Sequence, residues 1–236
     1  MTELILALDV ETQDEAHALA SPLRGQLRWV KLGLQLFTRH GPGIVDSFAE
    51  KGFKVFLDLK LHDIPNTVVS AIKSLRGRPC SLLTVHTLGG PAMLSRAMEA
   101  ARDALPNTEL LGVTVLTSMD AAQLAAVGIS FAPDAEVRLL AKMAVESGLS
   151  GLVCSPRELP LLRRELGPGP LLVTPGIRPG GAVADDQQRT LTPAEAAAFG
   201  ATHIVVGRPI LKAPDPVAAT LAIQREIAGA LRPDTF

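Results

Sequence analysis

Residues Lys54–Lys60 read KVFLDLK, a short apolar run that ends in charged residues and precedes a helix-like segment starting at Pro65. An apolar run of this length fits a strand that is buried on both faces. Seven further runs share the pattern: Leu4–Val10 (LILALDV), Trp29–Gly33 (WVKLG), Leu82–His86 (LLTVH), Leu111–Leu116 (LGVTVL), Gly151–Ser155 (GLVCS), Leu171–Pro175 (LLVTP) and His203–Gly207 (HIVVG). The chain therefore predicts eight buried parallel strands separated by helices.

Eight such strands within 236 residues fit one closed (β/α)8 TIM barrel, which we expect to span residues 1–236 as a single domain. Four segments carry apolar residues at helical spacing: Pro65–Leu75, Pro91–Leu105, Asp134–Glu146 and Asp215–Leu231. An open doubly wound sheet is the alternative, but no GxGxxG follows the first run, where a dinucleotide-binding fold would carry it. The polar, glycine-led segment Gly180–Thr192 (GGAVADDQQRTLT) predicts a mobile lid.

Composition excludes several classes of protein. The net charge of −1, the 3% of aromatic residues and the lack of tyrosine argue against nucleic acid or an anionic membrane as a partner. Two cysteines, Cys80 and Cys154, are too few for a disulfide framework and predict reduced, buried thiols. No apolar stretch approaches the roughly 18 residues of a membrane span, and MTELILALDV lacks the basic region of a signal peptide, so we expect a cytoplasmic protein.

Polar residues gather where the predicted strands end, and barrel enzymes keep their active sites at that end of the strands. These residues are Asp9, Lys31, Asp58, Lys60, His62, Asp63, His86, Thr117, Ser118, Arg178 and Arg208. Side chains two apart on a strand share a face, so Asp58 and Lys60 are predicted to point to the barrel axis, with Lys31 in the same layer. Opposite charges about 4 Å apart interact by about 1 kcal/mol in water and about 4 kcal/mol at an effective dielectric near 20. The pattern predicts a coupled array of alternating acids and amines.

Four of these residues also have a structural interpretation. Asp9 could cap the end of a strand, and Lys31 could extend its ammonium to solvent. Asp63 could cap the helix that starts near Pro65. His86 could be a hydrogen-bonded histidine at the edge of the core. The spacing Asp58-x-Lys60-x-x-Asp63 beside a second lysine favours chemistry over these separate readings.

The loops after the seventh and eighth runs predict an anion site, because these loops form the recurrent phosphate pocket of this fold. They read PGIRP at Pro175–Pro179 and GRPI at Gly207–Ile210. Gly207 lets backbone N–H groups approach an anion, Arg208 and Arg178 add cations, and Pro209 can start a helix. A Gly-Arg-Pro turn is common by itself, so the position beside Arg178 carries the prediction.

At these residues the sequence resembles orotidine 5′-phosphate decarboxylases of the bacterial type, over essentially the whole chain. The most specific segment is Asp58–Thr67 (DLKLHDIPNT). ALDV around Asp9, VKLG around Lys31, LTS at Leu116–Ser118, PGIRP and VVGRPI at Val205–Ile210 follow in the family's order, and Gln187 stands nine residues after Arg178. Val85–Gly90 (VHTLGG) departs from the His-Ala-Ser-Gly-Gly that the family more often has.

The resemblance implies the conversion of orotidine 5′-monophosphate to UMP and CO2, the final step of UMP biosynthesis, without a metal or organic cofactor. Lys60 would protonate C6 of the pyrimidine while Asp58 faces the departing carboxylate. It further implies these contacts: Lys31 and Asp9 with the ribose, Thr117 and Ser118 with the pyrimidine edge, Gln187 with base and phosphate, and Arg178, Gly207 and Arg208 with the phosphate. Asp63 and Thr67 would complete the site of the neighbouring subunit in a homodimer.

Two rival functions remain at this point. A metal-dependent sugar-phosphate epimerase or decarboxylase could use Asp58, His62 and His86 as ligands, although two ammonium groups beside them would repel a metal ion. A catalytically silent nucleotide-binding barrel would bind UMP without turnover.

Overall fold

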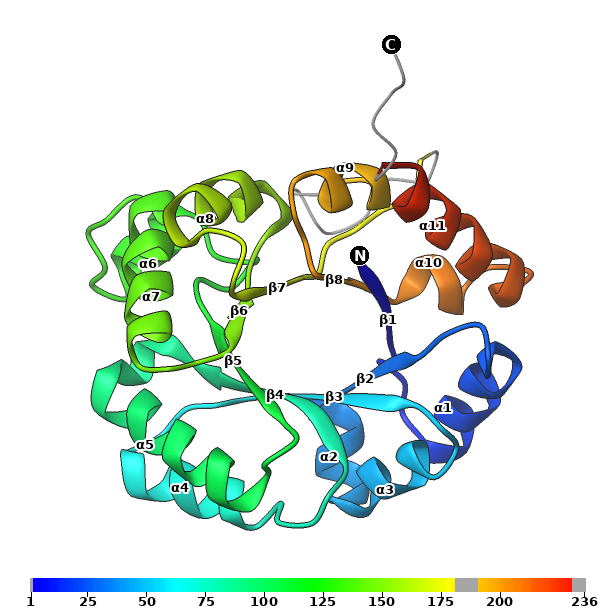
Figure 1. Cartoon of the computed structure of the whole chain (residues 1–236), viewed down its shortest axis with the longest axis horizontal. Coiled ribbons are helices and arrows are strands. Elements are labelled where there is room, and N and C mark those ends of the chain that lie inside the picture. The colour runs from blue at the N-terminus through cyan, green and yellow to red at the C-terminus, as the bar shows by residue number, and fades with distance from the viewer. Residues whose placement is uncertain (1, 181–190, 231–236) are drawn as a thin grey trace.

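The computed structural model describes residues 2–180 and 191–230, and its centre is a closed barrel of parallel strands (Figure 1). Neighbours in sequence pair along the whole series, and β1 also pairs with β8 to close the ring. The strands are β1 (Glu3–Ala7), β2 (Trp29–Gly33), β3 (Lys54–Leu61), β4 (Cys80–His86), β5 (Glu109–Val113), β6 (Gly151–Val153), β7 (Leu171–Thr174) and β8 (His203–Val206). The predicted (β/α)8 TIM barrel is confirmed.

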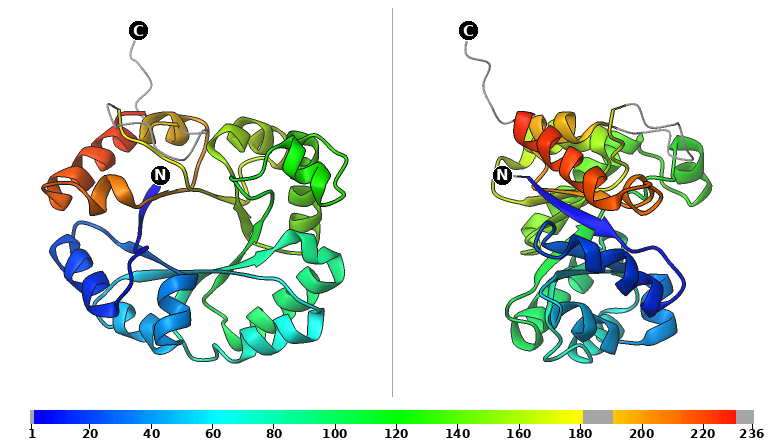
Figure 2. Two further views of the ribbon diagram at one scale, coloured as in Figure 1. Left: turned by 180° about the vertical axis from the view of Figure 1, so that it is seen from behind. Right: turned by 90° about the vertical axis from the view of Figure 1, so that its right-hand side faces the viewer.

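Helices surround the ring, as views along and across the barrel show (Figures 1 and 2). They are α1 (Gln13–Ala20), α2 (Leu34–His40), α3 (Gly43–Ala49), α4 (Pro65–Lys73), α5 (Gly90–Ala104), α6 (Ala121–Ala126), α7 (Pro133–Glu146), α8 (Leu159–Leu166), α9 (Pro193–Ala198), α10 (Arg208–Leu211) and α11 (Pro216–Ala230), with 3-10 turns η1 (Ser21–Leu23), η2 (Thr87–Gly89) and η3 (Pro156–Glu158). Pro65, Pro91 and Pro193 stand in the first turns of their helices, where a missing N–H costs nothing.

Five strands (β1 and β5 to β8) end one to three residues earlier than the apolar pattern predicts, and the differences are largest for β1 and β5. The first was expected to reach Val10 and ends at Ala7; the fifth was expected to reach Leu116 and ends at Val113. Val115 is nevertheless buried outside any strand, in a segment that turns where the Met119 N–H donates to the Leu116 carbonyl. An apolar run indicates that its residues are buried, and residues of a packed loop can be buried as well as residues of a strand.

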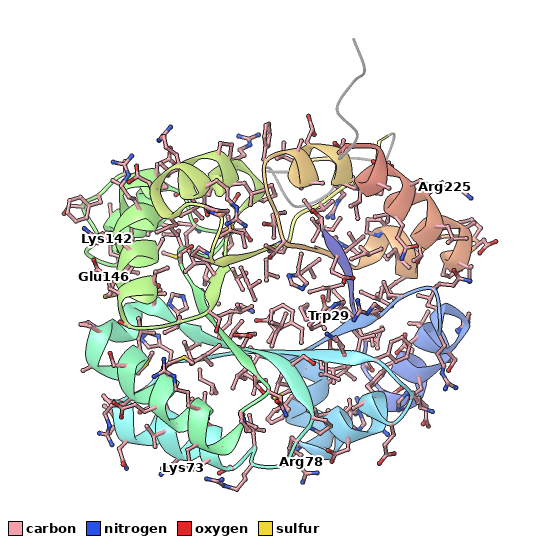
Figure 3. The ribbon with its side chains drawn as sticks, in the orientation of Figure 1. Trp29, Lys73, Arg78, Lys142, Glu146 and Arg225 are labelled. Atoms are coloured by element: carbon pink, nitrogen blue, oxygen red, sulfur yellow. The ribbon has the colours of Figure 1, made fainter. Side chains whose placement is uncertain are left out.

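Apolar side chains form two layers on either side of the strand ring. The inner layer fills the barrel and consists of Ile5, Ala7, Trp29, Phe56, Leu82, Leu111, Val173 and Val205. Trp29 belongs to this inner layer (Figure 3). Its ring lies nearly perpendicular to that of His203, with 5.1 Å between the centroids. The larger outer layer fills the space between strands and helices. Alternate residues of each strand therefore face the barrel axis.

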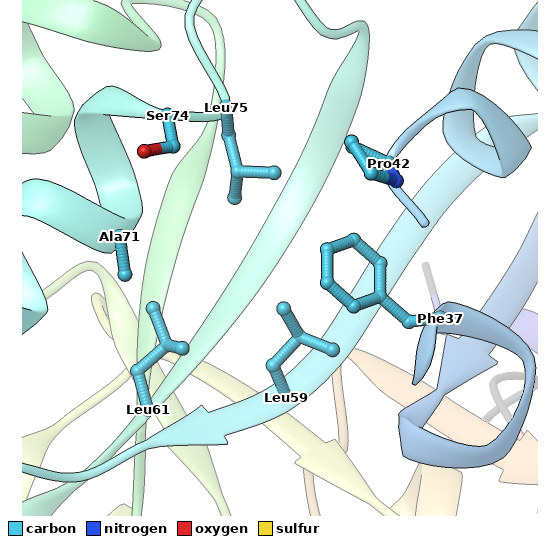
Figure 4. Close-up of a pocket in the computed structure, with 7 residues that line it drawn as sticks. All are labelled: Phe37, Pro42, Leu59, Leu61, Ala71, Ser74 and Leu75. Atoms are coloured by element: carbon cyan, nitrogen blue, oxygen red, sulfur yellow. The ribbon is translucent and has the colours of Figure 1, made fainter. Parts of the chain in front are cut away.

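Strand β3 shows this alternation most clearly. Its outward residues Leu59 and Leu61 point into a cavity of about 290 Å³ between β3 and the surrounding helices (Figure 4). The cavity is also lined by Phe37, Pro42, Ala71, Ser74 and Leu75. Asp58 and Lys60 alternate with these leucines along β3, so their side chains face the barrel mouth.

Cys80 and Cys154 are buried and free, as predicted. Burial raises the pKa of the Cys154 thiol to about 12, so it stays protonated and packs as an apolar group. Among residues 2–180 and 191–230, no helix has the length and apolar character needed to cross a membrane.

Candidate active site

Four charged side chains, three on β2 and β3 and one just beyond the end of β1, form one chain of ion pairs at the barrel mouth. Lys31 Nζ lies 2.9 Å from Asp9 Oδ1 and 3.8 Å from Asp58 Oδ2. Lys60 Nζ lies 2.8 Å from the same Asp58 oxygen. The order Asp9–Lys31–Asp58–Lys60 alternates in sign, as the strand ends predict.

Asp58 is the centre of this chain, because both ammonium groups approach one of its carboxylate oxygens. Its side chain is 12% exposed, as is that of Lys31, whereas Asp9 is 61% exposed. Charges shielded from water interact more strongly than exposed ones, so the Asp58 contacts outweigh the Asp9 contact in energy. Lys31 therefore does not extend to solvent, and Asp9 lies beyond the end of β1 as a partner of Lys31.

Lys60 is held in an unusual backbone conformation. Its φ is 50°, and it is the one non-glycine residue with positive φ within the described ranges. Side chains with a Cβ seldom adopt this region. The β3–β4 pairing shifts here: Leu57 pairs with Leu83 and Leu61 with Val85, so four steps on β3 match two on β4. Irregularities of this kind re-aim side chains next to active sites.

Asp63 and Thr67 lie at the rim and outside the ion-pair chain. Both are exposed, and Asp63 Oδ1 accepts a hydrogen bond from the Ile64 N–H at 2.6 Å. The N-cap of α4 is Ile64, without a side-chain capping bond. The interpretation of Asp63 as the helix cap is therefore wrong.

His86 ends β4 and stacks on His62, with 5.3 Å between ring centroids. Burial, reinforced by the charges of His62 and Lys60, lowers the pKa of His86 to about 4. Its Nδ1 accepts from the Leu88 N–H at 3.3 Å, which leaves the ring proton on Nε2. His86 is thus a neutral, hydrogen-bonded histidine near neutral pH, as its structural interpretation held.

The predicted anion-binding residues lie at the ends of β7 and β8, which are paired neighbours. Arg178 follows β7, and its guanidinium donates to the Ile177 carbonyl at 3.0 Å. Gly207 follows β8 directly and is the N-cap of the short helix α10, which begins with Arg208 and Pro209. The predicted helix start is confirmed, and both arginines follow the carboxyl ends of their strands, at the same end of the parallel barrel as the ion-pair chain.

Two further predictions concern the edge of the mouth. Thr117 and Ser118 are exposed in a turn after β5. Gln187 and most of the expected lid fall in 181–190, outside the described residues. The last lid residue, Thr192, belongs instead to the start of α9, where it and Glu195 form a capping box.

Thr84 is a site residue that the sequence reasoning missed. It lies on β4, fully buried, and its Oγ1 donates to Asp58 Oδ1 at 3.0 Å. Thr84 Oγ1 in turn accepts a hydrogen bond from the backbone N–H of Lys60 at 2.8 Å. A polar residue at an inward position of an apolar strand, two before His86, is the signal that could have found it.

The packing around Val85–Gly90 explains how this segment accommodates residues that differ from the His-Ala-Ser-Gly-Gly pattern. Thr87 is buried and donates to the Val113 carbonyl at 2.8 Å. A Cβ on Gly112 would approach Thr87 Cγ2 to 2.8 Å, so this threonine depends on the glycine of the next strand. Leu88 is 43% exposed at the rim. The substitutions shape the mouth without entering the ion-pair chain.

The ligand set of the metal-dependent rival is not assembled. Across residues 2–180 and 191–230, no three or more histidine, cysteine or acidic side chains lie together as metal ligands would. The rings of His62 and His86 stack on each other. Asp58 forms ion pairs with two lysines and accepts a hydrogen bond from a threonine.

Comparison with models of known protein families gives a match over nearly the whole chain. The model of the Orotidine 5′-phosphate decarboxylase / HUMPS family matches residues 2–223. The chain belongs to this family.

Relatives in the orotidine 5′-phosphate decarboxylase family are similar along almost their whole length. The orotidine 5′-phosphate decarboxylase of Opitutus terrae is 51% identical over 225 residues, which cover 95% of this chain and 98% of that protein. The one from Chromohalobacter salexigens is 48% identical over 227 residues, covering 96% of each. The crystal structure of the enzyme from Lactobacillus acidophilus superposes with a TM-score of 0.86 at 37% identity, covering 96% of this chain and 99% of that one.

Proposed function

We propose that this protein decarboxylates orotidine 5′-monophosphate to UMP and CO2, the final step of UMP biosynthesis. The observation that carries the proposal is the Asp9–Lys31–Asp58–Lys60 chain at the mouth of a barrel of this family. Relatives named for this activity, about half identical over nearly the full chain, support it.

Lys60 is the proton donor in this proposal. The bond between C6 and the carboxylate breaks, the electron pair stays on C6, and CO2 leaves. The Lys60 ammonium then gives one proton to C6 and is reprotonated from solvent, so substrate and one proton yield UMP and CO2. Because the ammonium supplies both the proton and the compensating charge, the reaction needs no metal or organic cofactor.

Asp58 makes the site prefer the transition state to the substrate. Both ammonium groups lie on its Oδ2, and the substrate carboxylate would be placed beside this acid. Repulsion between the two carboxylates disappears as CO2 departs, while attraction between Lys60 and the C6 carbanion grows. Interactions that strengthen in the transition state are the ones that raise kcat.

The remaining predicted residues bind the rest of the nucleotide in this proposal. Asp9 and Lys31 contact the ribose, and Thr117 and Ser118 contact the pyrimidine edge. Arg178, Gly207 and Arg208 hold the phosphate at the ends of β7 and β8. Gln187, which lies outside the described residues, bridges base and phosphate. Phosphate contacts remote from C6 then contribute to kcat as well as KM.

We also propose that the active form is a homodimer in which Asp63 and Thr67 complete the partner's site. Asp63 and Thr67 are exposed and contribute no ion pair to the chain of described residues around Asp58. Two large apolar side chains are exposed on the same rim: Ile64 at 67% and Leu34 at 56%. A second copy seated there would bury them and bring the partner's acid to the mouth.

The test is the loss of the orotate absorbance with purified protein in EDTA. Wild type should turn over, and Lys60→Ala should lower kcat by on the order of 10³-fold or more, since general acid catalysis is removed. Lys142→Ala is the matched control, because Lys142 is exposed on α7 and paired only with Glu146 among described residues. Turnover that needs added metal would favour the metal-dependent barrel, and UMP binding without turnover would favour the silent one.

A further inference from the structure

Within residues 2–180 and 191–230, Thr84 is the one residue whose side chain joins Asp58 to the backbone of Lys60, through its hydroxyl. It is fully buried on the inward face of β4. The Lys60 N–H can only donate, so Oγ1 accepts there at 2.8 Å and has its single proton left for Asp58 Oδ1 at 3.0 Å. Both hydrogen bonds therefore have a fixed direction.

This connection lies where the strand pairing is irregular. Between the pairs Leu57–Leu83 and Leu61–Val85, β3 has two more residues than β4. The Lys60 N–H bonds to the Thr84 side chain instead of to a carbonyl of the ladder. Because Lys60 also has a φ of 50°, its backbone sits in a conformation that its surroundings must hold in place.

The same hydroxyl sets the rotation of the Asp58 carboxylate. The terminal torsion of aspartate is broad and gives little orientation by itself. Thr84 occupies Oδ1, which leaves Oδ2 to Lys60 at 2.8 Å and Lys31 at 3.8 Å. The division of the two oxygens, one to the hydroxyl and one to the ammonium groups, orients the acid and the proton donor together.

We propose that Thr84 is a positioning residue for the decarboxylation, fixing the Asp58 carboxylate and the Lys60 backbone relative to each other through one hydroxyl. The inference rests on the proposed function. Without the hydroxyl, the Lys60 ammonium remains present and charged but is no longer held at the place where C6 would lie. Loss of placement lowers kcat more than it weakens nucleotide binding, most of which comes from residues on other strands.

The experiment compares kcat and KM for orotidine 5′-monophosphate in wild type, Thr84→Val and Thr84→Ser. Valine keeps the shape of the side chain and removes both hydrogen bonds, whereas serine keeps the hydroxyl. Thr84→Val should lower kcat on the order of 10²-fold, with KM changed less than about threefold. Thr84→Ser should keep kcat within about fivefold of wild type, because its hydroxyl can make both bonds.

Thr108→Val is the matched control for removing a buried threonine hydroxyl beside the same strand. Thr108 is buried, and its Oγ1 donates to the carbonyl of Cys80, the first residue of β4, at 2.7 Å. Its kcat should stay close to that of wild type. If Thr84→Val does not accumulate as folded protein, Thr84→Cys replaces it, and its weakly bonding thiol should still cost at least about tenfold in kcat.

Three results would overturn the inference while leaving the proposed function intact: a folded Thr84→Val with wild-type kcat, a Thr84→Ser as slow as the valine variant, or an equal loss of kcat in Thr108→Val. Failure of the wild type to decarboxylate would instead refute the proposed function, and the inference with it. A large loss of kcat in the valine variant with recovery in the serine variant supports both.

Discussion

Gly33, at the end of β2, leaves the space that the Lys31 ammonium occupies. A Cβ built there would lie 3.2 Å from Lys31 Nζ and 3.4 Å from Asp9 Oδ1. Gly33→Ala should therefore displace the ammonium by a few tenths of an ångström. Because small misplacements in a site are costly, we expect kcat/KM to fall about tenfold. The melting temperature should stay within about 3 °C, since the obstacle is a flexible side-chain end.

Gly43→Ala is the control for this substitution. Gly43 begins α3, and a Cβ there would meet nothing within 4 Å. Steady-state kinetics and thermal melting of both variants check the prediction. Equal kcat/KM in the two variants would show that Gly33 has no bearing on the position of Lys31.

At the scale of residues, the sequence was sufficient for the charged members of the site. Asp9, Lys31, Asp58 and Lys60 each follow or end an apolar run, and strand ends of a parallel barrel meet at one mouth. Thr84 could not be assigned its role in the same way. Its hydrogen bonds reach Lys60 and Asp58, which lie 24 and 26 positions earlier in the chain, and they depend on the register shift between β3 and β4. The inward polar position marks Thr84 as a candidate, but the sequence does not show the shift that sets its partners.

At the scale of elements, Arg163 ties the end of α8 to the turn between α9 and β8. Its guanidinium donates to the carbonyls of Gly200, Gly167 and Pro170 at 2.7 to 3.1 Å. Arg163→Ala leaves these partly buried carbonyls without their donor. We expect a loss of about 2–3 kcal/mol in the free energy of unfolding, measured by urea denaturation.

The neighbouring Arg164 provides the control for this loss. Its side chain is 69% exposed and lies 4.0 Å from Glu165 Oε1, a contact of little energetic value. Arg164→Ala should change the free energy of unfolding by less than about 0.5 kcal/mol. A similar change in both variants would mean that the three carbonyls are satisfied by solvent when Arg163 is removed.

The strands were predictable in number and order, and less so in their ends. The strand Trp29–Gly33 and the start of α4 at Pro65 agree with the predicted positions. The ends of β1 and β5 do not, because Leu8 and Val115 are buried beyond the last residues of their strands. Apolar periodicity follows burial, whereas a strand ends where its hydrogen-bond ladder ends.

At the scale of the whole molecule, the number of subunits is the property least accessible from one sequence. Periodicity within a chain describes how that chain buries its own residues. The exposed apolar residues Leu34 and Ile64 fit a contact surface for a second subunit, but single apolar residues are common on the surfaces of monomeric proteins as well. The contribution of Asp63 and Thr67 to a neighbouring site therefore stays a prediction that needs an experiment on mixed subunits.

Mixing two inactive variants tests the shared site directly. Lys60→Ala lacks the proton donor, and Asp63→Ala lacks the acid proposed to act across the interface. After subunit exchange, half of the dimers are mixed, and one site of each mixed dimer combines an intact Lys60 with an intact Asp63 from the partner. Activity should therefore recover to about a quarter of the wild-type value. If Asp63 acts within its own subunit, every site in the mixture keeps one defect, and no activity returns even when mass spectrometry verifies exchange.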